Sequence, residues 1–399
     1  MAYSTTSGNA FQFDRTIFAL RQHELQMKAT PAAYTSFIWD VLHAAGKAIS
    51  ASFGVVVAAV VFGALGVLPI LQFIPLGYLF RTQRRIACRG GVSVPAPYDV
   101  DILAWSRLGA RAFGWGLVLL PLVVVGWIVE HGEILEPGAL LYSLLRGLLP
   151  LFWGIALLHL VVAELRGGGR RLLDPWGGLK WLLQMRADEW PRIVRMCVDT
   201  VWEVADWGWQ LFLLGVRGYV ALIVWLLPSA MLLYFGSAWT WCEILSGVLL
   251  GLVTPFVLLG SVRFAVEDHI WAAWEIKELA RRIYRAPWSI AIALLAMGLL
   301  TLPLYFLTFE QPAWDTGWIL GTLAFLMVWP ARMIAAWAYT RTEPRSATRR
   351  LRVMAVPGLF CVLLLAAAYS LQMFYVQGWT WQGARIYFDQ HSFLLPNLH

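Results

Sequence analysis

The sequence predicts an all-α fold: a polytopic helical membrane protein with eight or nine membrane segments and cytoplasmic amphipathic interfacial helices. Of its 399 residues, 59% are apolar and 14% are charged, which lies outside the usual composition of soluble domains. The apolar residues occur in runs of about 20, the length that crosses a hydrocarbon core. Lys and Arg gather in alternate connections between these runs, which is the pattern of cytoplasmic loops.

Residues 1–48 are predicted to form an N-terminal cytoplasmic amphipathic segment. Phe13, Ile17 and Leu20 lie at helical spacing among charged residues, which indicates an interfacial helix. Because proline interrupts a helix, we expect this one to break near Pro31.

The first apolar stretch, residues 49–80, allows two interpretations. It could be one long tilted helix, or a span followed by a turn and a shorter half-helix over 72–85. Pro69 and Pro75 stand six residues apart near two glycines, and such residues break transmembrane helices. The sequence therefore favours the second interpretation, which gives nine membrane segments instead of eight.

The helical transmembrane domain is predicted to cover residues 49–377, and residues 378–399 are predicted to form an outward-facing tail. After the first apolar stretch, three short outer turns join the spans into hairpins. Seven further spans are expected, at 114–130, 138–163, 210–235, 242–262, 289–308, 317–340 and 354–377.

The positive charges predict an orientation. Because Lys and Arg stay in the cytoplasm during insertion, the loops that carry them indicate a prokaryotic inner membrane protein with its C-terminus outside. Residues 172–209 and 264–288 repeat aromatic and aliphatic residues at three- and four-residue intervals, which predicts amphipathic helices on the inner surface. Four connections hold 23 of the 31 Lys and Arg residues: 81–113, 164–209, 263–288 and 341–353.

Residues 68–115 carry a set of short motifs. The set comprises Gly77-Tyr78-Leu79 with Arg81, then Arg84-Arg85, Gly90-Gly91, and Pro95 and Pro97 before Asp99 or Asp101 and Trp105. This segment resembles a prokaryotic family of multi-pass membrane proteins that is catalogued as a domain of unknown function. The resemblance implies a bacterial or archaeal membrane protein, and it supplies no catalytic residues.

Motifs of the common enzyme classes are missing from the sequence in any usable context, including the P-loop, GxSxG, HExxH and GxGxxG. The four cysteines form no CxxC pair, so no disulfide is expected. His269 and Glu275 are six residues apart, which places them on different faces of a helix, so no metal site is expected. The positive charges line membrane ends, which argues against nucleic-acid binding. We therefore expect no catalytic residues, no cofactor, no metal and no nucleic-acid partner.

Three arginines fall inside apolar runs: Arg146, Arg217 and Arg332. Each lies about eight residues, or roughly 12 Å, from a membrane surface. A charge at that depth is costly, so something must solvate it. The options are snorkelling with structural hydrogen bonds, carbonyl groups of broken helices, trapped water, lipid phosphate or an anionic substrate. For Arg217 we expect carbonyl groups near Pro69 or Pro255, or an anionic lipid headgroup.

His159 and Glu164 form a second candidate site near the inner end of one span. They could carry a proton in a transporter, since ionisable groups inside membranes are often functional. Their position near the boundary also allows simple snorkelling to the headgroup region.

The absence of catalytic motifs and the large amphipathic surfaces favour a non-enzymatic function. We expect a scaffold, an assembly factor or an accessory subunit of a membrane complex, with membrane lipids and a membrane protein as partners. The alternative is a transporter or permease that moves an anionic or lipid substrate past the buried arginines.

Overall fold

The computed structural model describes residues 35–68, 70–88, 100–131, 140–166, 171, 174–184, 190–235, 240–307, 317–343 and 355–379. The chain divides into two units, residues 1–50 and 51–399, and each is described by itself. The described residues of the first unit are the opening turns of one helix. The interfacial helix expected before Pro31 and the tail beyond Trp379 lie outside the described residues.

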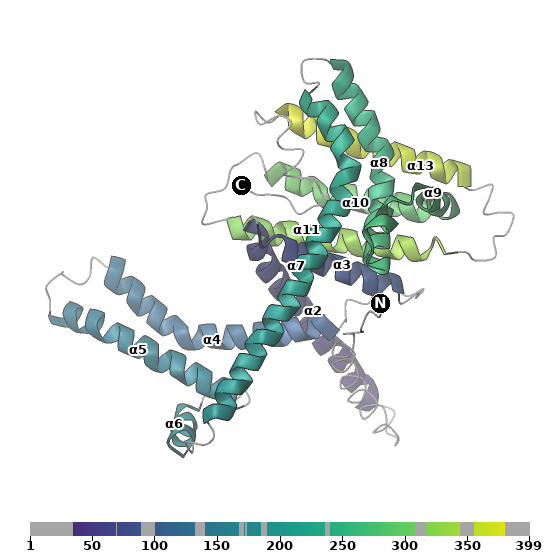
Figure 1. Ribbon diagram of the computed structural model, residues 1–399. Helices are drawn as coiled ribbons and strands as arrows, with labels where there is room; N and C mark the ends of the chain where they lie inside the picture. The colour runs from purple at the N-terminus through teal and green to yellow at the C-terminus, as the bar shows by residue number, and fades with distance from the viewer. Residues whose placement is uncertain are drawn as a thin grey trace, which may run out of the picture. The chain divides into compact units, whose positions relative to one another are not determined.

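All regular structure in the described residues is helical, which confirms the all-α class (Figure 1). The eleven α-helices are α2 (Thr35–Val67), α3 (Phe73–Cys88), α4 (Val100–His131), α5 (Leu140–Leu165), α6 (Pro175–Gln184), α7 (Trp190–Phe235), α8 (Thr240–Glu267), α9 (Ile276–Arg285), α10 (Pro287–Leu307), α11 (Gly317–Thr340) and α13 (Ala355–Trp379), and a 3₁₀ helix, η2 (Ile270–Trp274), follows α8.

Seven of these helices are long and apolar enough to cross a membrane, and an eighth span results if α9 and α10, bent by 98° at their junction, count as one. The chain is therefore a polytopic membrane protein. The ninth predicted segment is α3, whose 16 residues are too short to cross about 30 Å of hydrocarbon. The break between α2 and α3 shows that residues 49–80 are not one continuous helix, whereas the location of α3 in the membrane stays a prediction.

Helix α7 corrects the expectation for residues 172–209. An interfacial helix was expected there, separate from a span at 210–235, but residues 190–235 form one continuous helix of 46 residues. The amphipathic part and the span have the same helical period, and no proline separates them. The sequence pattern therefore does not indicate a boundary between them. Within the described part of that expected segment, α6 precedes α7.

Helix α6 begins at a local signal. The Asp174 carboxylate accepts a hydrogen bond of 2.8 Å from the Gly177 N–H, and Pro175 occupies the first helical position. This backbone hydrogen bond, with the nearby Arg166 guanidinium, holds the pKa of Asp174 below its usual value. The carboxylate therefore supports the start of α6 above that usual pKa, and this support is lost as the pH falls through the lowered pKa.

The second expected amphipathic segment, residues 264–288, is divided among the end of α8, η2, α9 and the start of α10. Helix α9 is amphipathic as predicted, because Leu279 and Ile283, four residues apart, are buried while Arg281 and Arg285 are exposed. Its location at the membrane surface stays a prediction.

Glycines let the central helices approach closely. A Cβ atom at Gly77 of α3 would overlap the Leu211 carbonyl group of α7, and one at Gly215 of α7 would overlap the Phe73 carbonyl group of α3. Gly63 of α2 and Gly321 of α11 make a similar crossing. Small residues at such crossings are the usual means of tight packing between membrane helices. The main core lies around α3, α7, α8, α10, α11 and α13.

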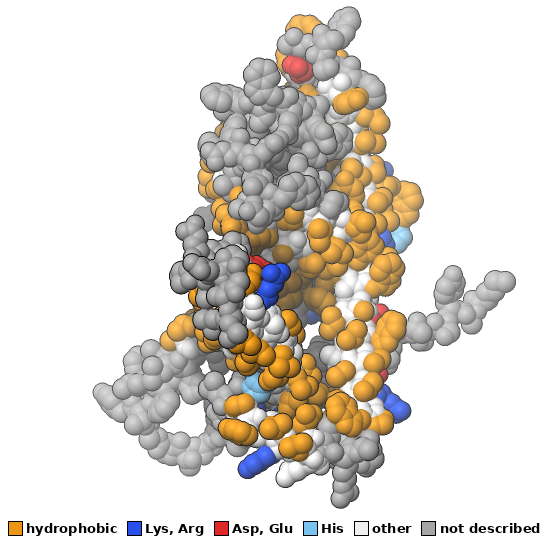
Figure 2. Space-filling model, turned by 90° about the vertical axis from the view of Figure 1, so that its left-hand side faces the viewer, with side chains coloured by type: hydrophobic (Ala, Val, Ile, Leu, Met, Phe, Trp, Pro, Cys, Tyr) orange, Lys and Arg blue, Asp and Glu red, His pale blue; other side chains and the backbone are white. Residues whose placement is uncertain are grey.

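Helices α4 and α5 form an antiparallel hairpin (Figure 1). Only 6% of the residues in the apolar window of α4 and 17% of those in α5 are buried within the chain, against 50% in α8 and 56% in α11. The hairpin therefore presents most of its apolar side chains outward. Figure 2 shows that hydrophobic side chains also dominate the visible described surface, with few charged groups among them.

Candidate functional site

Helix α3 contributes neighbouring residues to two polar clusters, one buried in the core and one half exposed. Gln83 is fully buried, whereas the next residue, Arg84, has a half-exposed side chain. Consecutive residues of an α-helix point about 100° apart, so one helix supplies both an inner and an outer polar group. We call Gln83, Ser261 and Arg332 the inner cluster, and Arg84, Arg217 and Asp268 the corner cluster.

The inner cluster surrounds a buried charge. Arg332 is 2% exposed, and its Nη1 donates a hydrogen bond of 3.4 Å to Oε1 of Gln83. Nε2 of Gln83 donates to Oγ of Ser261 and to the Arg332 carbonyl group, each at 3.5 Å. The guanidinium carbon also lies 5.3 Å from the centre of the Phe80 ring, within range of a cation–π interaction.

Arg332 has no counter-charge within the described part of the chain. Its Nε and Nη2 atoms are buried without a hydrogen-bond partner, and none of the described ion pairs includes it. Arg332 precedes the end of α11 by eight residues, about 12 Å, and its depth in the membrane stays a prediction. A buried, unpaired guanidinium is energetically unfavourable, and its free donors suit an anion or water.

The corner cluster lies where α8 ends. Asp268 follows the last residue of α8, and its carboxylate lies 3.4 Å from Nη1 of Arg217 and 3.9 Å from Nη1 of Arg84. Its backbone φ of 53° falls in the left-handed region, which aspartate tolerates better than most residues. One carboxylate thus stands beside two guanidinium groups.

This geometry corrects one expectation about Arg217. Its described partner is the carboxylate of Asp268, 51 residues away, and not a carbonyl group near Pro69 or Pro255. The depth of Arg217 in the membrane stays a prediction.

Two tryptophans hold η2 in place. Nε1 of Trp274 donates to the Ala221 carbonyl group at 2.8 Å, and Nε1 of Trp225 donates to the Ala273 carbonyl group at 3.0 Å. These reciprocal bonds tie η2 to α7. A Cβ atom at Gly260 would lie 2.9 Å from the Ala273 oxygen, so η2 also lies tightly against α8. Asp268 is therefore anchored by the segment that follows it.

The acidic residues around α9 form ion pairs with arginines. Arg263 bonds Glu267 at 2.8 Å and Glu275 at 2.6 Å, and Glu278 bonds Arg281 and Arg282 at 2.8 and 3.1 Å. Arg282 also donates to Thr342, which joins α9 to the end of α11. Among the described residues, no three His, Cys, Asp or Glu side chains could hold a metal ion.

The other predicted site residues lie in the α4–α6 region. Arg146 of α5 is exposed, and its Nη1 donates to the Tyr142 hydroxyl group at 3.2 Å. Glu164 lies 3.4 Å from Nη1 of Arg111 and accepts a bond of 3.2 Å from Nε1 of Trp115, so it joins α5 to α4.

His159 faces a different neighbour. Its Nδ1 lies 3.6 Å from the place that a Cβ atom at Gly178 of α6 would take. Proton transfer by His159 and Glu164 stays a prediction.

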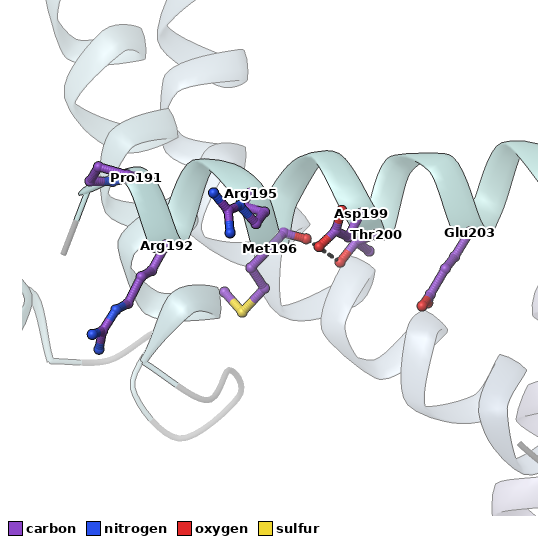
Figure 3. Close-up of a pocket in the computed structure, with 7 residues that line it drawn as sticks. All are labelled: Pro191, Arg192, Arg195, Met196, Asp199, Thr200 and Glu203. Atoms are coloured by element: carbon purple, nitrogen blue, oxygen red, sulfur yellow. Dashed lines mark hydrogen bonds between the residues drawn. The ribbon is translucent and has the colours of Figure 1, made fainter. Parts of the chain in front are cut away.

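A shallow depression runs along the first half of α7 (Figure 3). Its seven lining residues all belong to that one helix, and their only drawn contact is the bond of 2.8 Å from the Thr200 hydroxyl group to the Met196 carbonyl group. A pocket that encloses a ligand needs walls from several elements. We therefore assign it no function; the lining residues are Pro191, Arg192, Arg195, Met196, Asp199, Thr200 and Glu203.

Sequence reasoning did not identify Gln83 or Arg84 as site residues, and it did not connect Asp268 with either arginine. Asp268 follows Glu267 at the end of α8, but its partners lie far away in sequence. No known protein family, curated protein or solved structure matches the chain, so the resemblance of residues 68–115 stays a prediction.

Proposed function

We propose that the protein is an accessory or assembly subunit of a membrane complex and that the α4–α5 hairpin is its partner-docking element. The observation that carries the proposal is the low burial of the two hairpin spans, 6% and 17%, beside 50% and 56% for α8 and α11. A span needs no contact with its own chain if lipid or another protein covers it. The following features favour another protein.

Helix α5 has an open face that fits a neighbouring helix. Gly147 and Gly154 lie seven residues apart, so they share one face, and nothing described comes within 4 Å of a Cβ atom at either. Exposed glycines on a membrane helix allow the close approach of a partner helix. Arg146, next to Gly147, has only the Tyr142 side chain as a described partner, so a carboxylate on the partner would complete its bonding.

The distribution of Lys and Arg supports a prokaryotic inner membrane with the C-terminus outside. In that orientation the α8–η2–α9 corner faces the cytoplasm. The alternative function, transport of an anionic or lipid substrate, is favoured by one observation, the buried guanidinium of Arg332 with its two unpartnered nitrogen atoms.

The docking proposal is tested by adding apolar bulk to the open face. In the double variant Gly147→Trp and Gly154→Trp, a fluid lipid shell adapts to the rings, whereas a packed protein helix cannot. We expect a photo-crosslinker at Leu151, on the same face, to give one discrete protein adduct in native membranes. The double variant should reduce its yield about tenfold or more, the effect of losing a central contact.

The matched control is Leu299→Trp, an exposed position on α10 outside the hairpin, which should leave the adduct unchanged. Equal adduct yield in the double variant, or crosslinks to lipid alone, would contradict docking through α5. An adduct made of two copies of this chain would replace the accessory-subunit proposal with self-association.

A further inference from the structure

We propose that the corner cluster binds the phosphate headgroup of an anionic membrane lipid and that α7 holds one acyl chain of that lipid. This proposal does not rest on partner docking, because the corner cluster and the α4–α5 hairpin are different parts of the chain. It assigns a ligand class to a surface formed by α3, α7 and the end of α8.

The corner cluster has more N–H donors than its described ion pairs use. Each guanidinium carries five N–H donors, and among the described ion pairs Arg84 and Arg217 are each paired with the Asp268 carboxylate alone. Two positive charges against one negative charge leave a net charge of about +1. The three side chains are roughly half exposed, so an anion can reach them from the membrane surface. Guanidinium groups bind phosphate oxygens in a planar, bidentate manner.

The two arginines are held at a fixed separation. They lie on α3 and α7, whose backbones are in contact at Gly77 and Gly215, and Gly218, next to Arg217, lies against the Phe80 ring. The tryptophan bonds of η2 fix Asp268 beside them. A site built on packed helices needs little rearrangement when its ligand binds.

An apolar stripe continues from the site along α7. The stripe steps by three and four residues, so its members share one helix face with Arg217. The stripe extends for about 21 Å from Arg217. An acyl chain that crosses half of a hydrocarbon core of about 30 Å at a tilt has a similar length. The described part of the chain leaves the stripe partly open, and its members, each 37–48% exposed, are Val220, Val224, Leu227 and Met231.

Two features indicate a lipid instead of a soluble phosphate compound. The apolar stripe begins directly below the cationic group, so one molecule with a phosphate and a hydrocarbon chain matches both. Trp271 of η2 is exposed near Asp268, and indole prefers the headgroup region of a membrane. The site therefore lies at the depth where lipid phosphates occur.

Native mass spectrometry of the purified protein in detergent tests the proposal, with phosphatidylglycerol and phosphatidylcholine as probes. We expect retained phosphatidylglycerol and little phosphatidylcholine. The double variant Arg84→Gln and Arg217→Gln should weaken phosphatidylglycerol binding about tenfold or more, since each bond to a charged group contributes strongly. Arg195→Gln, which removes an exposed arginine about 33 Å along α7 from Arg217, is the control and should change nothing.

Asp268→Asn gives the sharper result, because asparagine tolerates the left-handed backbone while losing the carboxylate that competes with phosphate. We expect this variant to bind phosphatidylglycerol more tightly than the original protein, an outcome that misfolding cannot imitate. Weaker or unchanged binding in Asp268→Asn would overturn the proposal. Equally tight binding of glycerophosphoglycerol, the same headgroup without acyl chains, would overturn the lipid assignment in favour of a soluble anion.

Discussion

Replacing Gly215 with alanine is expected to destabilise the protein strongly, whereas Gly208→Ala on the same helix should be neutral or slightly stabilising. At Gly215 the new methyl group would overlap the Phe73 carbonyl group, and a backbone group cannot rotate away as a side chain can. Helices α3 and α7 would have to separate, at a cost of about 3 kcal/mol. At Gly208 no atom lies within 4 Å, so alanine adds only helix propensity, about 0.5–1 kcal/mol.

Thermal unfolding of the detergent-solubilised variants measures this difference. A second variant, Gly77→Ala, tests the same crossing from the other helix and should behave like Gly215→Ala, because it overlaps the Leu211 carbonyl group. If Gly215→Ala and Gly208→Ala unfold at the same temperature, the close crossing of α3 and α7 is incorrect. The corner cluster would then lose the framework that fixes its two arginines.

Replacing Arg332 with methionine is expected to stabilise the folded protein, by about 1–4 kcal/mol. Methionine fills a similar elongated space, and the substitution removes a buried charge whose Nε and Nη2 atoms lack partners. Gln83→Leu should have the opposite effect, because it removes the acceptor of Nη1 and leaves the guanidinium with fewer bonds.

The two substitutions form a double-mutant cycle. In the Arg332→Met background, Gln83→Leu should cost little stability, because the guanidinium that Gln83 accepts a hydrogen bond from is absent. The coupling free energy between the two substitutions should be about 1–3 kcal/mol. The midpoints of unfolding in detergent give the cycle directly. A loss of stability in Arg332→Met as large as that in Gln83→Leu would show that Arg332 is satisfied by groups outside the described contacts. A stabilised Arg332→Met protein would indicate that the arginine is present for a functional reason.

The parts of the fold that could be predicted from the sequence are those with local signals. The break between α2 and α3 was predictable because Pro69 and Pro75 stand close together in an apolar run. The start of α6 carries Asp174 and Pro175, a common pair at a helix start. The continuity of α7 was not predictable, because Gly208 and the residues around it neither stop a helix nor change its period.

The candidate sites also combine features that have a local sequence signal with contacts that have none. That Arg332 lies inside a span follows from its place in an apolar run, but its bond to Gln83 joins residues 249 positions apart. The partner of Arg217 could not be predicted, because Asp268 lies 51 residues away and follows another helix. Glu164 lies near His159 in sequence, but its described contacts are with Arg111 and Trp115 of α4. Contacts between distant helices decide these cases, and no local pattern encodes them.

The proposed docking of a membrane partner by the α4–α5 hairpin is tested by the mass of the complex that is purified in mild detergent from native membranes. We predict that native mass spectrometry finds the chain with a second polypeptide in fixed stoichiometry. We also predict that the Gly147→Trp and Gly154→Trp double variant, purified in the same way, loses that polypeptide while remaining folded. Recovery of the original chain with lipid alone, at the same mass as the double variant, would contradict the account.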